Sequence, residues 1–258
     1  MAEIAAESLA AAARALMLAG RWAQAADLLA AAAPAEGEQP ALALAAAEVA
    51  VDQDFWTRTD GGASALSRIS PGYDADVVRL RHDYFSELTP PGSDGPRFGP
   101  DGRDSAVLSS LTSRAAQLLD AAPDPARAAA AMFFTGLIAD NLRGDEIAGR
   151  AAFAKAADMA REAGDDLTES EALRHLGYHV SEAGDTELAR QQWERSLMLR
   201  QRAGCVPYVL AQQLLLAGLA SDTGDTQTAR VLAGHVRNWS HELGIGLLEA
   251  GADSLLPS

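Results

Sequence analysis

The chain has 258 residues, of which 48% are hydrophobic and 5% aromatic, and its 21 Lys and Arg against 36 Asp and Glu give a net charge of −15. This acidic excess repels a phosphate backbone and no basic stripe offsets it, so nucleic acid is excluded as an expected partner. The lone Cys205 excludes a disulfide framework, and no uncharged apolar run reaches the ~18 residues of a membrane span, so we expect a cytoplasmic protein that does not enter a membrane.

The first 122 residues are predicted to form a series of short helices. Ala and Leu, which favour helix, are abundant, whereas the β-branched residues that favour strands are scarce. The apolar start carries Glu3, Glu7 and Arg14, which indicates a folded helix and not a signal peptide. Helices are expected at 2–19, 22–33 and 41–53, with a linker at 37–40, then a short helix after the Asp60-Gly61-Gly62 turn and one at 74–88.

One irregular segment, Thr89–Arg103, interrupts this series. Its four prolines and four glycines prevent both helix and strand, so we expect an insertion between two helices. Insertions in helical arrays cluster on one face, which is often the binding face. Two interpretations stay open: a lid that folds Phe98 over such a face, and a disordered surface loop.

The second half of the chain repeats with a step of 40 residues. Gly-Asp pairs begin at 144, 184 and 224, and further glycines stand at 164, 204 and 244. A period of this length is typical of a stacked helical array. A helix is expected at 104–121, directly after the insertion. The repeating glycines then bound helices expected at 125–142, 146–163, 167–182, 186–203, 207–222 and 226–243, with a capping helix at 245–256.

Local signals agree with these helices. Asp145, Asp185 and Asp225 each precede a helix start, where a carboxylate accepts hydrogen bonds from free backbone amides. The glycines that end the helices suit a left-handed residue. Arg200, like Arg161 and Arg202, is interpreted as a cation that compensates a helix C-terminus.

One stretch carries a recognisable pattern of small and large residues. It comprises Leu173, Leu176, Gly177 and Val180, followed by Ala189 and Trp193. This spacing resembles the tetratricopeptide repeat, although the period of 40 exceeds the family's ~34 residues. Longer variants resemble the arrays attached to bacterial signalling ATPases and transcription activators. The resemblance implies an all-α, right-handed α-solenoid of about six antiparallel helix pairs plus a capping helix, forming one domain over 1–258 that is regular at 125–243 and weaker at 1–122.

The resemblance also implies a concave face, lined by the first helix of each pair, that binds peptides or proteins. The positions of that face fall between the packing positions just named. They place Arg174, His175 and Tyr178 on the face in the best-matching repeat, Phe134 and Ile138 one repeat earlier, and, by a looser analogy, Arg79 and His82 on the helix at 74–88. The Lys and Asn set that clamps a C-terminal carboxylate in some members of the family is missing.

No catalytic residue, metal or cofactor is predicted. His175 and His179 have the spacing of two metal ligands on one helix, but no third ligand stands nearby in the sequence. The three consecutive residues His82-Asp83-Tyr84 point to different helix faces. No phosphate-binding loop, dinucleotide motif or nucleophile elbow occurs.

The resulting hypothesis is a non-enzymatic adaptor or regulatory protein that binds a peptide or protein segment in its concave groove. Phe134, Ile138 and Tyr178 would supply apolar contact, and Arg174 and His175 polar anchoring. The alternative is a small-molecule sensor or an enzyme on a helical scaffold, with Arg79 and His82 joining the Arg174 group under the Pro/Gly segment.

Overall fold

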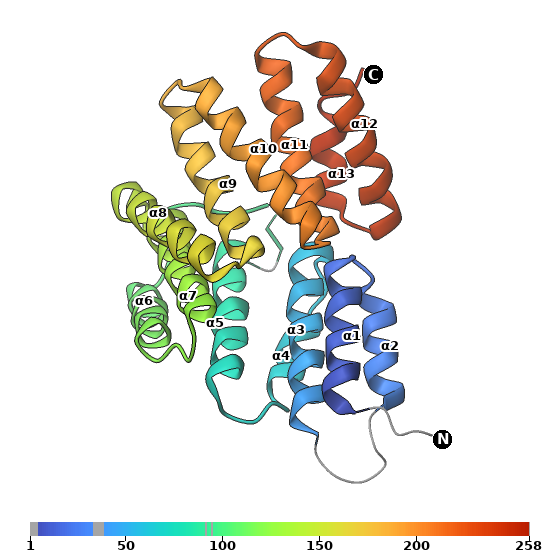
Figure 1. Cartoon of the computed structure of the whole chain (residues 1–258), viewed down its shortest axis with the longest axis vertical. Coiled ribbons are helices and arrows are strands. Elements are labelled where there is room, and N and C mark those ends of the chain that lie inside the picture. The colour runs from blue at the N-terminus through green and yellow to red at the C-terminus, as the bar shows by residue number, and fades with distance from the viewer. Residues whose placement is uncertain (1–4, 33–38, 91, 94, 258) are drawn as a thin grey trace. The chain divides into compact units, whose positions relative to one another are not determined.

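The computed structural model describes residues 5–32, 39–90, 92–93 and 95–257, and over these residues all regular structure is helical (Figure 1). Contacts divide the chain into two compact units, Met1–Ser86 and Glu87–Ser258, and each is described by itself. The single domain stays a prediction. The start of the helix predicted at 2–19, the last residue of the helix predicted at 22–33, residues 37 and 38 of the linker, and Pro91 and Asp94 of the insertion lie outside the described residues.

The first unit is built from five helices within the described residues. They are α1 (Ala6–Leu18), α2 (Trp22–Ala32), α3 (Pro40–Thr57), α4 (Gly62–Leu66) and α5 (Tyr73–Leu88), the last two residues of α5 falling in the second unit. Helix α3 packs against α1, α2 and α4, and its Ala47 and Val51 form a core with Ile69, Ala75 and Val78. A buried Asp52 on α3 accepts from Trp22 Nε1 at 2.8 Å and pairs with Arg81, which ties α2 and α5 to α3.

Helix α3 is longer than predicted, because a turn folds back onto its last residues. The Asp54 carboxylate accepts from the amides of Gly61 at 3.0 Å and Gly62 at 2.6 Å. Helix α3 therefore continues to Thr57 and ends at Arg58, which has a left-handed φ of 61°.

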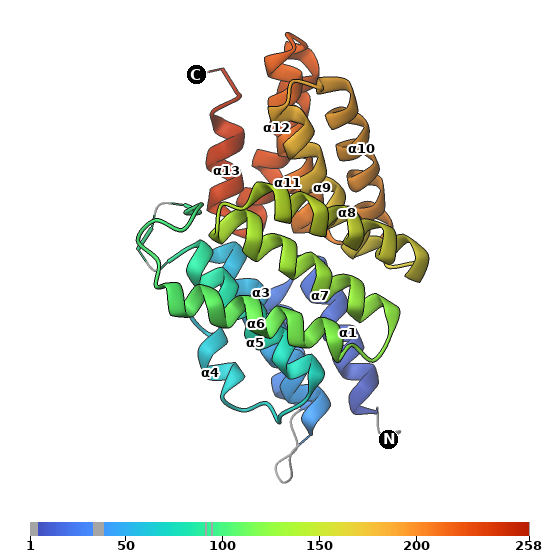
Figure 2. The ribbon, with the colours of Figure 1, turned by 90° about the vertical axis from the view of Figure 1, so that its left-hand side faces the viewer.

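The second unit contains the repeats. Its helices are α6 (Ser105–Asp120), α7 (Pro125–Leu137), the π-helical turn η1 (Ile138–Leu142), α8 (Glu146–Ala163), α9 (Asp166–Glu182), α10 (Thr186–Arg202), α11 (Val206–Asp222), α12 (Thr226–Leu243) and α13 (Gly246–Asp253). Each helix from α6 to α13 packs against the next, and α7 and α11 also pack against α9 and α13, respectively (Figures 1 and 2). The fold is the predicted all-α solenoid of helix pairs, with α13 covering its end; the right-handed twist stays a prediction.

The predicted capping signals are confirmed. The carboxylates of Asp145, Asp185 and Asp225 each accept from the backbone amide three residues further on. Gly164 and Gly244 close α8 and α12 with φ of 71°, a conformation that costs glycine little. The boundaries of α8 and α12 match the sequence prediction because both ends of each helix carry such a signal.

Small residues let the helices of a pair approach closely, as predicted. A Cβ on Gly177 would lie 2.5 Å from Trp193 Cδ1, and one on Gly136 would lie 2.6 Å from the Phe153 ring. The Trp193 indole also donates from Nε1 to the Arg174 carbonyl at 2.9 Å. Each glycine therefore provides the space that a large aromatic side chain of the second helix fills.

The Pro/Gly insertion is held by hydrogen bonds in its described part. The almost completely buried Arg103 donates from Nε to the Gly99 carbonyl at 2.9 Å, and its Nη1 lies 3.0 Å from Glu87 Oε2. The Gly99 amide donates to the Asn141 carbonyl at 2.9 Å, which joins the loop to η1. Phe98 is 67% exposed, so most of its side chain faces solvent in this structure, and the lid stays a prediction.

Candidate functional site

Helix α9 presents a stripe of polar and aromatic residues, which we call the α9 face. Residues three and four apart lie on one side of a helix, and here they are Glu171, Arg174, His175, Tyr178 and Glu182. One repeat earlier the same positions hold Ala131, Phe134, Thr135, Ile138 and Leu142; one repeat later they hold Ala211, Leu214, Leu215, Gly218 and Asp222. The α9 face therefore carries charge where α7 and α11 carry mainly apolar or small residues.

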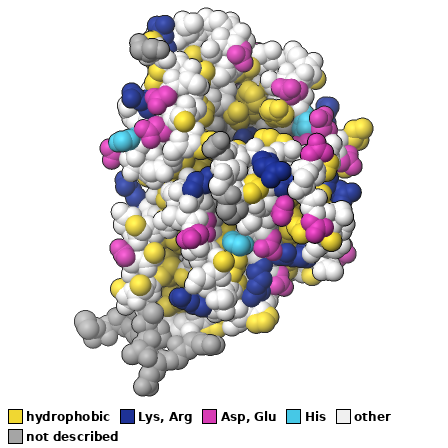
Figure 3. Space-filling view, turned by 180° about the vertical axis from the view of Figure 1, so that it is seen from behind, with side chains coloured by type: hydrophobic (Ala, Val, Ile, Leu, Met, Phe, Trp, Pro, Cys, Tyr) yellow, Lys and Arg dark blue, Asp and Glu magenta, His cyan; other side chains and the backbone are white. Residues whose placement is uncertain are grey.

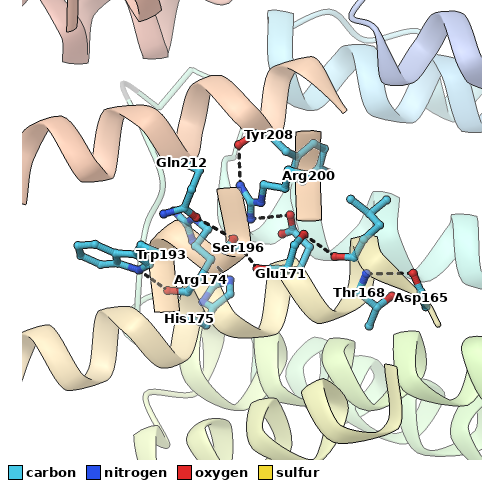
Figure 4. A network of polar contacts seen from close by, with 12 residues as sticks. Asp165, Thr168, Glu171, Arg174, His175, Trp193, Ser196, Arg200, Tyr208 and Gln212 are labelled. Carbon is cyan, nitrogen blue, oxygen red and sulfur yellow. Dashed lines mark hydrogen bonds and ion pairs between the residues drawn. The ribbon is translucent and has the colours of Figure 1, made fainter. Parts of the chain in front are cut away.

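A buried ion pair lies beneath this face (Figure 4). Arg200 of α10 is fully buried, its Nη2 lies 2.7 Å from Glu171 Oε1, and its Nη1 donates to the Tyr208 carbonyl at 2.7 Å. Ser196, one turn earlier on α10, donates to the Ser170 carbonyl at 2.7 Å and lies 3.0 Å from Gln212 Oε1. The interpretation of Arg200 as a cation at a helix end is thus incomplete, because its guanidinium joins α9, α10 and α11.

Helix stacking alone does not require this polar network. Its members Glu171, Ser196, Arg200 and Gln212 correspond, 40 residues earlier, to Ala131, Ala156, Ala160 and Ala172. One repeat later the positions hold Ala211, Val236, Ser240 and Ala252. The repeats before and after therefore form the same helix contacts with small or apolar, uncharged residues. The charged residues of the network occur only in the central one of these three repeats.

His175 is held neutral between aromatic rings and arginines. Its imidazole stacks on Phe153 with centroids 4.5 Å apart, and Arg174 Nη1 lies 3.5 Å from its Nε2. Burial first, and then the charges of Arg174, Arg200 and His179, lower the pKa of His175 well below its ordinary value. In the tautomer that carries its proton on Nδ1, the neutral imidazole has a lone pair at Nε2 that can accept from Arg174 Nη1.

This depressed pKa predicts a loss of stability in mild acid. Below the ordinary value of 6.5 the unfolded chain takes up a proton that folded His175 does not. The stabilising contribution is therefore complete above pH 6.5 and decreases as the pH falls towards the folded pKa, by up to about 1.4 kcal/mol per pH unit. The His175→Gln variant, whose amide oxygen still accepts from Arg174, should lose less stability between pH 7 and pH 5.5 in urea unfolding.

The matched control for this comparison is His235→Gln, because His235 is exposed on α12. This variant should keep the pH dependence of the unmodified chain. An identical pH dependence for His175→Gln and the unmodified chain would show that His175 does not carry the effect.

Tyr178 lies beside a buried acid–base pair. Its side chain is 51% exposed, and its ring centroid is 6.1 Å from that of His179. His179 Nε2 lies 3.3 Å from Asp140 Oδ2, and the two side chains are 9% and 11% exposed. Asp140 belongs to η1 and packs against Gly149, where a Cβ would lie 2.6 Å from the Asp140 Cβ.

The other predicted site residues are placed as follows. Phe134 is partly buried on α7, with its ring centroid 6.3 Å from that of Phe133. Ile138 is 1% exposed, so in this structure it is a core residue and presents no surface to a partner. Arg79 and His82 belong to the first unit, where Arg79 pairs with Asp76 at 3.0 Å and His82 Nδ1 lies 3.2 Å from Asp83.

The sequence interpretation missed two pairs of interacting polar side chains, Asp140–His179 and Glu171–Arg200. A signal for each was present: Asp140 stands where the next two repeats have Val180 and Ala220, and Arg200 stands where its neighbours have Ala160 and Ser240. Within the described ranges, no group of three or more His, Cys, Asp and Glu side chains is arranged to hold a metal ion. Nor is any helix there both long and apolar enough to cross a bilayer.

The fold and the α9 face define this chain as an all-helical repeat protein. No protein-family model matches the sequence, and no curated protein sequence matches it. One similar solved structure is a STAND signal-transduction ATPase with a tetratricopeptide repeat sensor from Pyrococcus horikoshii, at 13% identity and a TM-score of 0.47. The match covers 92% of this chain but 36% of that protein.

Proposed function

We propose that this chain is a non-enzymatic adaptor or regulatory module that binds a peptide or protein segment along the α9 face. Tyr178 serves as the aromatic anchor, Arg174 as the polar anchor, and Phe134 on the adjacent α7 adds apolar contact. The observation that carries the proposal is the half-exposed ring of Tyr178 on the first helix of a pair. The equivalent positions hold the buried Ile138 and the glycine Gly218.

Tyr and Arg are the side chains that most often dominate protein interfaces, because each combines a large contact area with a polar end. The Arg174 side chain is partly buried and lies against neutral His175, so less conformational freedom is lost when a partner binds it. On the face of the molecule shown in Figure 3, acidic and basic side chains are interspersed without a basic stripe. This pattern suits a protein partner better than a nucleic acid.

The test compares two double variants that remove the same kinds of side chain. Arg174→Gln with Tyr178→Ala removes both anchors from the α9 face. Arg190→Gln with Trp239→Ala removes an exposed Arg and a half-exposed Trp from the second helices α10 and α12. Partners captured from a lysate and quantified by mass spectrometry should be depleted about 30-fold or more by the first variant, the effect of a lost hot spot, and retained by the second.

Both variants should keep the helical circular dichroism of the unmodified chain. If both retain the same partners, or both lose them equally, the α9 face is not the binding surface.

A further inference from the structure

We propose that the end of the α9 face is a cation-recognition site that takes a Lys or Arg side chain of the bound segment, between the ring of Tyr178 and the carboxylates of Asp140, Glu146 and Glu182. This inference rests on the proposed function and specifies the chemistry of the partner. None of the residues described so far has been assigned to the recognition of a cation.

The four side chains converge from three elements. Glu182 lies one helical turn after Tyr178 on α9. Asp140 reaches the same place from η1, as its 3.3 Å approach to His179 shows. Glu146 lies one helical turn before Gly149, the α8 residue that packs against Asp140. Burial first, and then the charges of Glu182, Asp140 and Glu146, raise the pKa of the Tyr178 hydroxyl. The charges of these three carboxylates agree with a placement of all three around the Tyr178 ring.

The exposed ring supplies a feature that acidic residues alone do not have. A Lys or Arg cation over the face of a Tyr ring is attracted by the negative potential of that face. Helix α9 ends at Glu182 and η1 at Leu142, and helix C-termini add partial negative charge that also favours a cation. Ile147, next to Glu146 and 87% exposed, can cover the aliphatic stem of a long basic side chain.

In the buried pair behind the ring, His179 compensates the Asp140 carboxylate only in part. His179 is nine-tenths buried, and its Nε2 makes no hydrogen bond within the described residues, although it lies 3.3 Å from Asp140 Oδ2. Burial raises the pKa of Asp140 despite the attraction of His179. A cation that enters beside Asp140 would stabilise the ionised carboxylate that burial disfavours.

The charge of the site also decides between partners. An acidic or phosphorylated segment would meet three carboxylates at Tyr178 and be repelled, whereas a basic segment would be attracted by this site and by the net charge of −15. The proposed occupant is therefore a basic peptide segment.

The test uses two capped octapeptides of Ala and Leu, one with a central Lys and one with norleucine at that position. Each is titrated into the full chain while the ring resonances of Tyr178 and the methyl resonances of Ile147 are followed by NMR. The Lys peptide should shift these resonances saturably, and the norleucine peptide should bind about fivefold more weakly or not at all. Higher salt should weaken only the Lys peptide.

Variants of the carboxylates make the assignment specific. Glu146→Gln and Glu182→Gln should each weaken Lys-peptide binding about fivefold, whereas the control Glu162→Gln, at the other end of α8, should leave it unchanged. Equal binding of the two peptides, or unchanged binding by both glutamine variants, overturns the inference.

The two proposals fail in distinguishable ways. If captured partners are lost with Arg174→Gln/Tyr178→Ala but retained with Glu146→Gln/Glu182→Gln, the α9 face binds the partner without a cation site. The opposite result is that the Lys peptide binds as predicted while Arg174→Gln/Tyr178→Ala and Glu146→Gln/Glu182→Gln both still capture the partners. The cation site then exists and the proposed function is wrong.

Discussion

Replacing Arg200 with Met is expected to lower the free energy of unfolding by about 3 kcal/mol, because it leaves Glu171 as a carboxylate without its cation. Arg200 is fully buried, and its guanidinium contacts both Glu171 and the Tyr208 carbonyl. Met fills much of the same volume, so most of the loss reflects the missing charge and hydrogen bond and not a cavity. Urea unfolding followed by circular dichroism at pH 7 measures the loss.

The second half of this experiment removes both charges together. Glu171→Ala combined with Arg200→Met should be less destabilised than the sum of the two single variants by at least about 1 kcal/mol. The basis is that Ala131 and Ala160 occupy the equivalent positions one repeat earlier in the same fold. Strictly additive losses would show that Glu171 and Arg200 are not energetically coupled.

Replacing Gly177 with Ala should cost about 2–3 kcal/mol, even though Ala is the better helix former. The added Cβ would lie 2.5 Å from Trp193 Cδ1, well inside van der Waals contact. Trp193 would have to move, and its hydrogen bond to the Arg174 carbonyl would be lost or lengthened. The same urea unfolding experiment measures this effect.

Gly218 provides the matched control in α11. Nothing lies within 4 Å of a Cβ built there, so Gly218→Ala should raise stability by about 0.5–1 kcal/mol through helix propensity and a less flexible unfolded chain. If Gly177→Ala is as well tolerated as Gly218→Ala, the close packing of α9 on α10 at Trp193 does not contribute to the free energy of unfolding.

The fold of the second unit was predictable because its signals are local. Asp145 and Gly164, for example, each act on a helix end within a few residues of their own position, and the 40-residue step repeats them. The π-helical turn at Ile138–Leu142 gave no such signal, and neither did the extension of α3 to Thr57. Both depend on residues that fold back from elsewhere: the Gly99 amide at Asn141, and the Gly61 and Gly62 amides at Asp54.

The candidate site was predictable only in part. The resemblance to the tetratricopeptide repeat placed Arg174, His175 and Tyr178 on one face, and their helical spacing along α9 agrees with it. It also placed Ile138 there, but the packing of neighbouring elements buries this residue. The pairing of Asp140 with His179 depends on how closely η1 approaches α9, and a single sequence does not encode that approach in any short pattern. The signal available for this pair was a polar residue at a position where the neighbouring repeats have an apolar or small residue.

Photo-crosslinking from position 178 tests the central claim most directly. A photoreactive aromatic amino acid is incorporated there, and in a second chain at position 239, where Trp239 is 44% exposed on α12. Illumination in a lysate should attach position 178 to a discrete protein through a segment rich in Lys or Arg, while position 239 gives no such product. Crosslinks of the same partner from position 239 and none from position 178 would contradict the assignment of the α9 face as the binding surface.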